Sequence, residues 1–199
     1  MSGARAQLLS LLAQKSFRVG EFKLSAGGTT DYYVDCRVTT LDAVGARLTG
    51  QVFLEEIRAR GWAVEAIGGL TLGADPITVA VAVLSEGRLS GFLVRKDEKT
   101  HGTGQRIEGF CRKDARVVIV DDVCTTGAST LQAIAAARQS GLQVAGVVCL
   151  VERTEAGGRA SVEQAAAPAP FVALFTADDI RAEYRRQHPQ LPPAGNALS

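Results

Sequence analysis

VVIVDDVCTTGAST, residues 117–130, is the most informative stretch of this chain for its fold. It opens with four β-branched residues, a continuous apolar run typical of a strand buried on both faces of a parallel sheet. Two carboxylates, Asp121 and Asp122, end the run, and small hydroxylated residues and Gly127 follow before a helical pattern begins. This order predicts a strand, turn and helix of an α/β fold, with ligands bound at the turn.

Strand and helix patterns alternate in the same way along most of the chain. Strands are expected at 64–67, 91–94, 117–120, 144–151 and 171–175, and helices at 4–14, 42–60, 74–84, 131–139 and 177–186. Residues 17–35 indicate short strands and turns. Residues 157–158 and 165–170 are expected to be loops, with a Gly-Gly turn after the first strand. The alternation predicts a mostly parallel central sheet flanked by helices.

Composition excludes several classes of protein. A chain of 199 residues, 46% hydrophobic and 22% charged, can bury a core without disulfides or a structural metal. Its net charge of +1 gives no reason to expect nucleic acid or an anionic membrane as partner. Four cysteines without a CxxC pair indicate buried reduced thiols rather than a zinc site. The longest apolar run, 79–84, is too short to span a membrane, so a cytoplasmic protein is expected.

The turn after residues 117–120 has the chemistry of a phosphate site. Backbone N–H groups at a helix N-terminus, with Thr and Ser hydroxyls beside them, attract an anion, and Gly127 allows close approach. Two adjacent carboxylates would repel that anion, so they suit a vicinal diol or a Mg²⁺ ion held through water. Ribose 5-phosphate offers both diol and phosphate. Helix capping by one of the two carboxylates is the simpler alternative.

This stretch resembles the signature with which type I phosphoribosyltransferases bind phosphoribosyl pyrophosphate (PRPP). The resemblance implies that the acidic pair contacts the ribose hydroxyls and that the following loop binds the 5-phosphate. It also implies Mg²⁺ as cofactor, held mainly by PRPP and water with no direct protein ligand. The PRPP-binding residues implied here are Asp121, Asp122, Val123, Cys124, Thr125, Thr126, Gly127, Ala128 and Ser129.

A second segment, RKDEKTHGTG at 95–104, combines three cations, a histidine and two glycines. A solvated charge run is the usual interpretation of such a segment. Beside a phosphate site, however, it suits a lid that closes over a polyanion. It resembles the lid of the orotate phosphoribosyltransferase family, Arg-Lys-x-x-Lys-x-His-Gly. The resemblance implies PRPP contacts from Arg95, Lys96, Lys99 and His101, with catalytic roles for Arg95, Lys99 and His101.

Three further segments resemble the same family. Residues 22–35 match its N-terminal segment, and 68–76 match its pyrophosphate loop, which in family members carries a non-proline cis peptide near Thr71–Leu72. Arg153 ends a predicted strand, where a solvated charge is the alternative; the resemblance implies that Arg153 and Thr125 bind orotate. Relatives often carry a cation at three positions where this chain has Ser25, Gly28 and Gly73.

The resemblance as a whole implies a glycosyltransferase that joins orotate to PRPP, giving orotidine 5′-phosphate and pyrophosphate in pyrimidine (UMP) biosynthesis. One domain is expected over 1–199, with a hood and N-terminal helix in about 1–40, the core sheet in about 62–176 and a loose tail at 187–199. A homodimer is implied, with the lid 96–109 closing over the neighbouring subunit's site.

Two alternatives stay open at this point. A purine or uracil phosphoribosyltransferase would share residues 121–129, although the lid sequence argues against it. A non-catalytic PRPP-sensing regulator could use the same fold. Such a protein needs a surface for nucleic acid, and neither the net charge of +1 nor any appended segment supports one.

Overall fold

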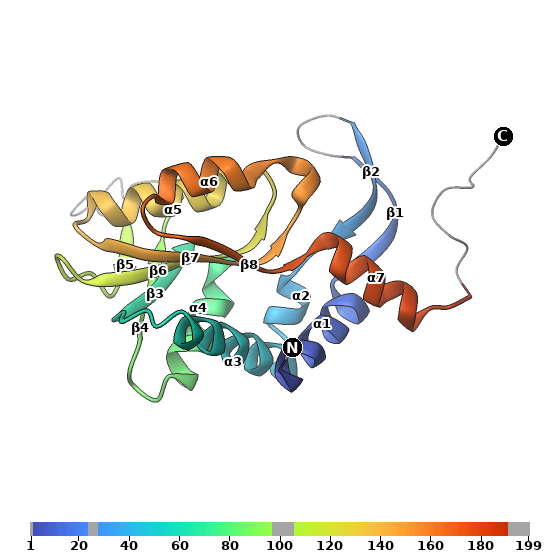
Figure 1. The fold of residues 1–199 in the computed structure, drawn as a ribbon, viewed down its shortest axis with the longest axis horizontal. Coiled ribbons are helices and arrows are strands. Elements are labelled where there is room, and N and C mark those ends of the chain that lie inside the picture. The colour runs from blue at the N-terminus through green and yellow to red at the C-terminus, as the bar shows by residue number, and fades with distance from the viewer. Residues whose placement is uncertain (1, 24–27, 97–105, 191–199) are drawn as a thin grey trace.

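A six-stranded sheet with strand order β5-β4-β3-β6-β7-β8 forms the centre of the protein (Figure 1). The computed structural model describes residues 2–23, 28–96 and 106–190. All neighbouring strands are parallel except the edge pair β4–β5. The strands are β3 (Ala66–Leu70), β4 (Ser90–Val94), β5 (Ile107–Gly109), β6 (Arg116–Cys124), β7 (Gln143–Glu152) and β8 (Phe171–Thr176). The predicted α/β fold with a mostly parallel sheet is confirmed.

Helices cover both faces of this sheet (Figure 1). They are α1 (Gly3–Lys15), α2 (Arg37–Thr40), α3 (Ala43–Ala59), α4 (Ala74–Leu84), α5 (Ala128–Gln139), α6 (Gly158–Ala166) and α7 (Ala177–Gln187), with a 3₁₀ turn η1 (Thr154–Ala156). In β6, Val118 and Val120 point to the face covered by α1, α3, α4 and α7. Val117 and Ile119 point to the face covered by α5 and α6. Two apolar layers explain why β6 lacks the polar alternation of a half-exposed strand.

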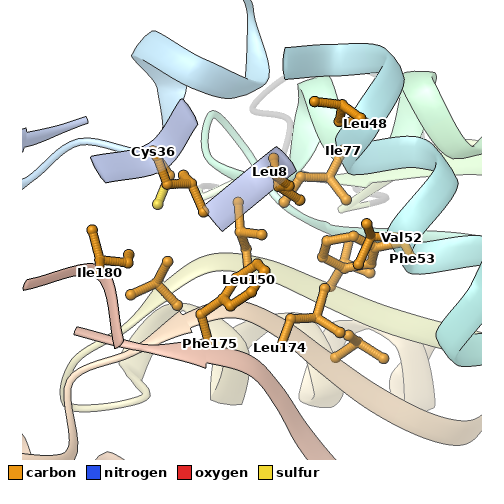
Figure 2. Close-up of a cluster of buried hydrophobic side chains, with 14 of the residues drawn as sticks. Leu8, Cys36, Leu48, Val52, Phe53, Ile77, Leu150, Leu174, Phe175 and Ile180 are labelled. Carbon is orange, nitrogen blue, oxygen red and sulfur yellow. The ribbon is translucent and has the colours of Figure 1, made fainter. Parts of the chain in front are cut away.

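The larger of the two layers surrounds Phe53, Leu150 and Leu8, which are buried completely (Figure 2). Helix α3 begins at its N-cap Asp42, whose Oδ1 accepts from the backbone N–H groups of Val44 and Gly45 at 3.0 Å each. Burying an apolar side chain of the size of Phe53, Leu150 or Leu8 contributes about 1.5–3 kcal/mol to the stability of the fold. This layer therefore holds α1 and α3 rigidly against the sheet.

A second, two-stranded sheet forms a hood beside one end of the core (Figure 1). Its antiparallel strands are β1 (Phe17–Lys23) and β2 (Thr29–Val34). Phe17 stacks on Tyr32, with ring centroids 5.4 Å apart, and packs against Tyr184 of α7 at 5.2 Å. The hood is thus anchored to the last helix of the chain.

Strands β6 and β3 are longer than predicted. β6 continues through the acidic pair to Cys124, because β7 pairs with it as far as Glu152. β3 contains the Gly68-Gly69 pair that was expected to follow it as a turn. A Cβ at Gly68 would lie 2.1 Å from the Phe92 carbonyl oxygen, and one at Gly69 2.0 Å from that of Val120. The glycines therefore permit close packing inside the sheet rather than a turn.

Helices α5 and α6 also differ from the prediction. α5 begins at Ala128, three residues before the expected start at 131. The loops expected at 157–158 and 165–170 instead flank or belong to α6, which buries Val162 and Ala166. Burial of this apolar face stabilises α6, although the glycines at its start and the alanine-rich stretch at its end had indicated loops. The helix ends shortly before Pro168, because the residue before a proline disfavours helical backbone.

The cysteine prediction holds for three of the four thiols. Cys36, Cys124 and Cys149 are buried and unpaired, but Cys111 is exposed. No helix in the described ranges is both long enough and apolar enough to cross a lipid bilayer.

Candidate active site

The carboxyl ends of β3, β6 and β7 border a cavity of about 330 Å³ beneath the hood. Its lining balances three carboxylates against three cations and adds small polar residues. The lining residues are Tyr33, Val34, Asp35, Arg37, Leu70, Thr71, Leu72, Gly73, Lys96, Asp121, Asp122, Val123, Thr125, Ser129 and Arg153. The volume is at the lower end of the range for small-molecule sites.

The N-terminus of α5 faces this cavity. Gly127, with φ +80°, is its N-cap, and no side chain caps the helix. The first N–H groups of a helix lack partners within it, so they are available to an anion together with the hydroxyl of Ser129. Because neither Asp121 nor Asp122 caps α5, the capping explanation of the acidic pair is wrong.

Asp121 and Asp122 are held on the last residues of β6. Asp121 Oδ2 accepts from Thr130 Oγ1 at 2.6 Å, and Asp121 Oδ1 accepts from the backbone N–H of Asp122 at 3.0 Å. Asp122 Oδ1 accepts from the backbone N–H of Val123 at 2.9 Å. Each oxygen keeps lone pairs for further donors, because a carboxylate has about four acceptor sites. The pair is thus positioned to accept hydrogen bonds from a diol.

Burial raises the pKa of Asp121 to about 7, although the Thr130 hydroxyl opposes this shift. Burial also raises the pKa of Asp122, and both the Val123 N–H and the charge of Arg37 oppose it. Removing a carboxylate from water disfavours its charged form. A bound diol or cation would restore the interactions that the ionised pair lacks.

The loop after β3 has the conformation that the family resemblance implied. The peptide bond between Thr71 and Leu72 is cis, as predicted. Gly73 follows, and a Cβ at this position would lie 2.3 Å from Asp122 Oδ1. Close approach of the carboxylate therefore requires glycine here, and a lysine like that of some relatives would force Asp122 to move.

Arg153 is held firmly at the end of β7 rather than solvated. Its side chain is only 12% exposed. Its Nε donates to Tyr32 Oη at 2.9 Å and to Glu155 Oε1 at 3.0 Å, and its guanidinium lies 4.6 Å from the centre of the Tyr32 ring. The alternative of a solvated charge at the strand end is therefore wrong.

The predicted site residues did not include three polar residues of the cavity: Tyr33, Asp35 and Arg37. Tyr33 lies near the end of β2, Asp35 follows that strand and Arg37 begins α2, and all three line the cavity together with the acidic pair. Arg37 Nε and Nη2 donate to the two oxygens of Asp35 at 2.9 and 3.0 Å. Tyr33 and Asp35 lie in the segment 22–35 that resembles the family, but no role in the site was assigned to them; for Arg37 the sequence signal was a charged pair with Asp35, two residues before it.

The structure brings some of the predicted site residues together in the cavity and places others outside it. The cavity lining includes Lys96, Asp121, Asp122, Val123, Thr125, Ser129 and Arg153. Arg95 lines an adjoining hollow with Thr71 and Leu72, and its Nη1 lies 3.4 Å from Glu108 Oε1. The Cys124 side chain is buried in the core, while Thr126 and Gly127 lie in the turn and Ala128 begins α5. Ser25, Lys99 and His101 lie outside the described residues.

Proteins of known family resemble this chain over most of its length. No family model matches the chain. An orotate phosphoribosyltransferase from Thermosynechococcus vestitus is 41% identical over 192 residues, which are 94% of this chain and 97% of that one. The chain belongs to the orotate phosphoribosyltransferase family. Orotate phosphoribosyltransferases are glycosyltransferases, and this chain is accordingly an enzyme of that class.

Further comparisons agree with the family. An orotate phosphoribosyltransferase from Streptomyces avermitilis is 40% identical, covering 90% of this chain and 98% of that one. The crystal structure of the Mycobacterium tuberculosis orotate phosphoribosyltransferase in complex with PRPP is 32% identical, with a TM-score of 0.75. It covers 89% of this chain and 99% of that chain. The likeness to the family thus extends over the fold as well as the sequence.

Proposed function

We propose that this chain transfers the 5-phosphoribosyl group of PRPP to orotate, giving orotidine 5′-phosphate and pyrophosphate in de novo pyrimidine biosynthesis. One observation carries the proposal: a single cavity contains an acidic pair, a free helix N-terminus and a fixed arginine. Diol, phosphate and carboxylate are the groups that these three features bind best. The whole of residues 1–199 would form one domain of this activity.

PRPP would lie along the end of β6. Asp121 and Asp122 accept hydrogen bonds from the ribose hydroxyls, and the turn from Thr125 to Ser129 binds the 5-phosphate. The N–H groups of α5 and the hydroxyls of that turn donate to the phosphate oxygens. Gly127 keeps the backbone close to the phosphate because its left-handed conformation suits no larger residue well.

Magnesium fits the same cavity, since hard cations prefer oxygen ligands and three carboxylates, among them the acidic pair, line it. Within the described residues, no group of three or more His, Cys, Asp or Glu side chains gathers to hold a metal. We therefore propose that PRPP and water supply most of the ligands of Mg²⁺. When bound, the ion would neutralise negative charge on the pyrophosphate.

Catalysis by this site would need no protein nucleophile. Bond breaking at the anomeric carbon develops an oxocarbenium-like ribose and a negatively charged leaving group, which positioned cations stabilise. Lys96 lines the cavity, and Arg95 would have to exchange Glu108 for pyrophosphate. Lys99 and His101 are the proposed proton donors and pyrophosphate contacts.

A parallel assay with four bases tests this function. Pyrophosphate release from PRPP and Mg²⁺ is measured with orotate, uracil, hypoxanthine and adenine. We expect turnover with orotate alone, because only orotate offers a carboxylate to the fixed guanidinium of Arg153. Turnover with a purine or uracil instead would identify another phosphoribosyltransferase. Binding of PRPP without any turnover would identify the non-catalytic regulator.

Arg153→Ala should raise the Michaelis constant for orotate much more than that for PRPP. Truncation removes a charge-assisted hydrogen-bond donor, and such bonds contribute about 1.5–3 kcal/mol. The expected rise for orotate is thus about tenfold to a hundredfold. Steady-state kinetics with each substrate varied in turn measure both constants. An equal rise for the two substrates would place Arg153 outside the base pocket.

We also propose a two-fold homodimer in which the lid 96–109 closes over the neighbouring subunit's site. An exposed apolar surface on α4 and the turn between α2 and α3 supports the dimer: Leu41, Val79 and Val83 are 71%, 59% and 71% exposed and line one hollow. Asp75 lines it too, and its buried Oδ1 has no hydrogen-bond partner in the described part of the chain. Arg47 lines the same hollow, so the surface carries charges of both signs, which suits a self-complementary two-fold contact.

A further inference from the structure

Tyr32 of the hood contacts more charged groups than any other aromatic ring that the structure describes. Its side chain is buried, with a relative exposure of 5%. The guanidinium groups of Arg153 and Arg181 each lie 4.6 Å from the centre of its ring, an arrangement that attracts a cation to an aromatic face. Arg181 also donates to both oxygens of Asp31 at 2.8 and 3.0 Å. Strand β2 is thereby fixed to α7 on one side and to the end of β7 on the other.

The hydroxyl of Tyr32 joins two charged side chains of opposite sign. It accepts from Arg153 Nε at 2.9 Å and donates to Glu155 Oε1. Burial first, and the hydrogen bond to Glu155 second, raise the pKa of Tyr32 to about 12. The phenol therefore keeps its proton near neutral pH and stays a donor to Glu155.

These contacts occupy one edge of the Arg153 guanidinium. Nε is bound by Tyr32 and Glu155, and Nη2 lies 3.0 Å from Glu155 Oε1 and 3.4 Å from Thr30 Oγ1. A guanidinium is a rigid planar fork, so fixing one edge also fixes the direction of the remaining N–H groups. Because Arg153 lines the cavity, those groups are available to a planar ligand there.

We propose that Tyr32, supported by Glu155, is a positioning residue that aims the Arg153 guanidinium at the carboxylate or carbonyl of the incoming base. The inference rests on the proposed function and adds to it a role for the hood in binding the base. Tyr32 acts through Arg153, 121 positions away in the sequence. The hood would therefore set base affinity without its Tyr32 ring touching the base.

Tyr32→Phe tests the proposal, because it keeps the ring and its stacking but removes the hydroxyl. We expect the Michaelis constant for orotate to rise about tenfold, equivalent to about 1.4 kcal/mol. The Michaelis constant for PRPP should change less than about twofold, which is a nearly neutral effect. Tyr184→Phe is the matched control: it removes a phenol hydroxyl from the same aromatic cluster, and no hydrogen bond joins that hydroxyl to Arg153. This control should leave both constants unchanged.

A double-mutant cycle separates positioning from general damage to the fold. In the Arg153→Ala background, Tyr32→Phe should raise the orotate constant no further, because the group it positions is gone. Glu155→Gln, at the exposed turn η1, weakens the same network without disturbing the core and should raise the orotate constant by a smaller factor. Thermal unfolding of each variant checks that the fold is intact.

The possible failures are distinguishable. If the wild-type chain does not turn over orotate, the proposed function is wrong. If it does, and Arg153→Ala acts selectively on orotate, three results would each overturn the positioning role alone. They are a Tyr32→Phe variant with wild-type constants, one that affects both substrates equally, and one whose effect persists in the Arg153→Ala background.

Discussion

Asp121→Asn and Asp122→Asn each lower kcat/KM for PRPP by about a hundredfold or more while the fold stays intact, if the acidic pair binds the ribose. Each substitution replaces a charged acceptor of hydrogen bonds from the diol, and two such bonds at about 1.5–3 kcal/mol each account for a loss of this size. The substitution nearly preserves shape: an asparagine at 121 could still accept from the Asp122 N–H and donate to Thr130. Kinetics with PRPP varied at saturating orotate provide the measurement.

The stability of Asp121→Asn should change in the opposite direction to its activity. Because burial raises the pKa of Asp121, the folded chain holds its proton to a higher pH than the unfolded chain. The free energy of unfolding therefore falls as the pH rises from about 4, the ordinary pKa of aspartate, and levels off above the raised value. Asp121→Asn lacks this penalty, so it should melt at a higher temperature than the wild-type chain at pH 8, with little difference at pH 4.

Asp42 offers a control for the acidic pair, because it caps α3 and lies outside the cavity. Asp42→Ala should lower the free energy of unfolding, because it removes the N-cap of α3 and the ion pair with Lys15. Its kcat/KM for PRPP should stay at the wild-type value. Wild-type PRPP kinetics in both Asp121→Asn and Asp122→Asn would contradict the ribose assignment.

Mixing two inactive variants, Lys99→Ala and Asp122→Asn, should restore about a quarter of wild-type activity if the lid acts on the neighbouring subunit. Dissociating and remixing the two chains puts about half of the dimers in the mixed form. Each mixed dimer then has one site with both lesions and one intact site. Half the dimers with half their sites active give the expected quarter.

A second mixture controls for simple stabilisation on remixing. Asp121→Asn with Asp122→Asn leaves one lesion in every site of a mixed dimer, so no activity should return. If the lid serves its own subunit, the Lys99→Ala mixture also stays inactive, because each site again carries one lesion. Light scattering that shows a monomer at the assay concentration would rule out the arrangement directly.

The regular elements with short-range signals could be predicted from the sequence. Asp42 and Gly61 bound α3 closely, because capping and a left-handed terminal glycine act within one turn of helix. The apolar run at 117–120 indicated a buried strand, and the acidic pair with its turn indicated the phosphate chemistry. All of these signals come from residues adjacent in the chain, which is why periodicity and motif spacing reveal them.

Contacts between distant segments required the tertiary structure. β6 passes through Asp121 and Asp122 because backbone pairing with β7 extends it, and no local preference encodes that pairing. Gly68 and Gly69 resemble a turn until the neighbouring strands are seen to exclude any side chain from them. Tyr32 meets Arg153 only once the hood folds against the end of β7. Burial and hydrogen bonding between such segments depend on the whole packed fold, so local sequence specifies the elements and the PRPP motif, whereas packing determines the shape of the cavity and the orientation of its arginine.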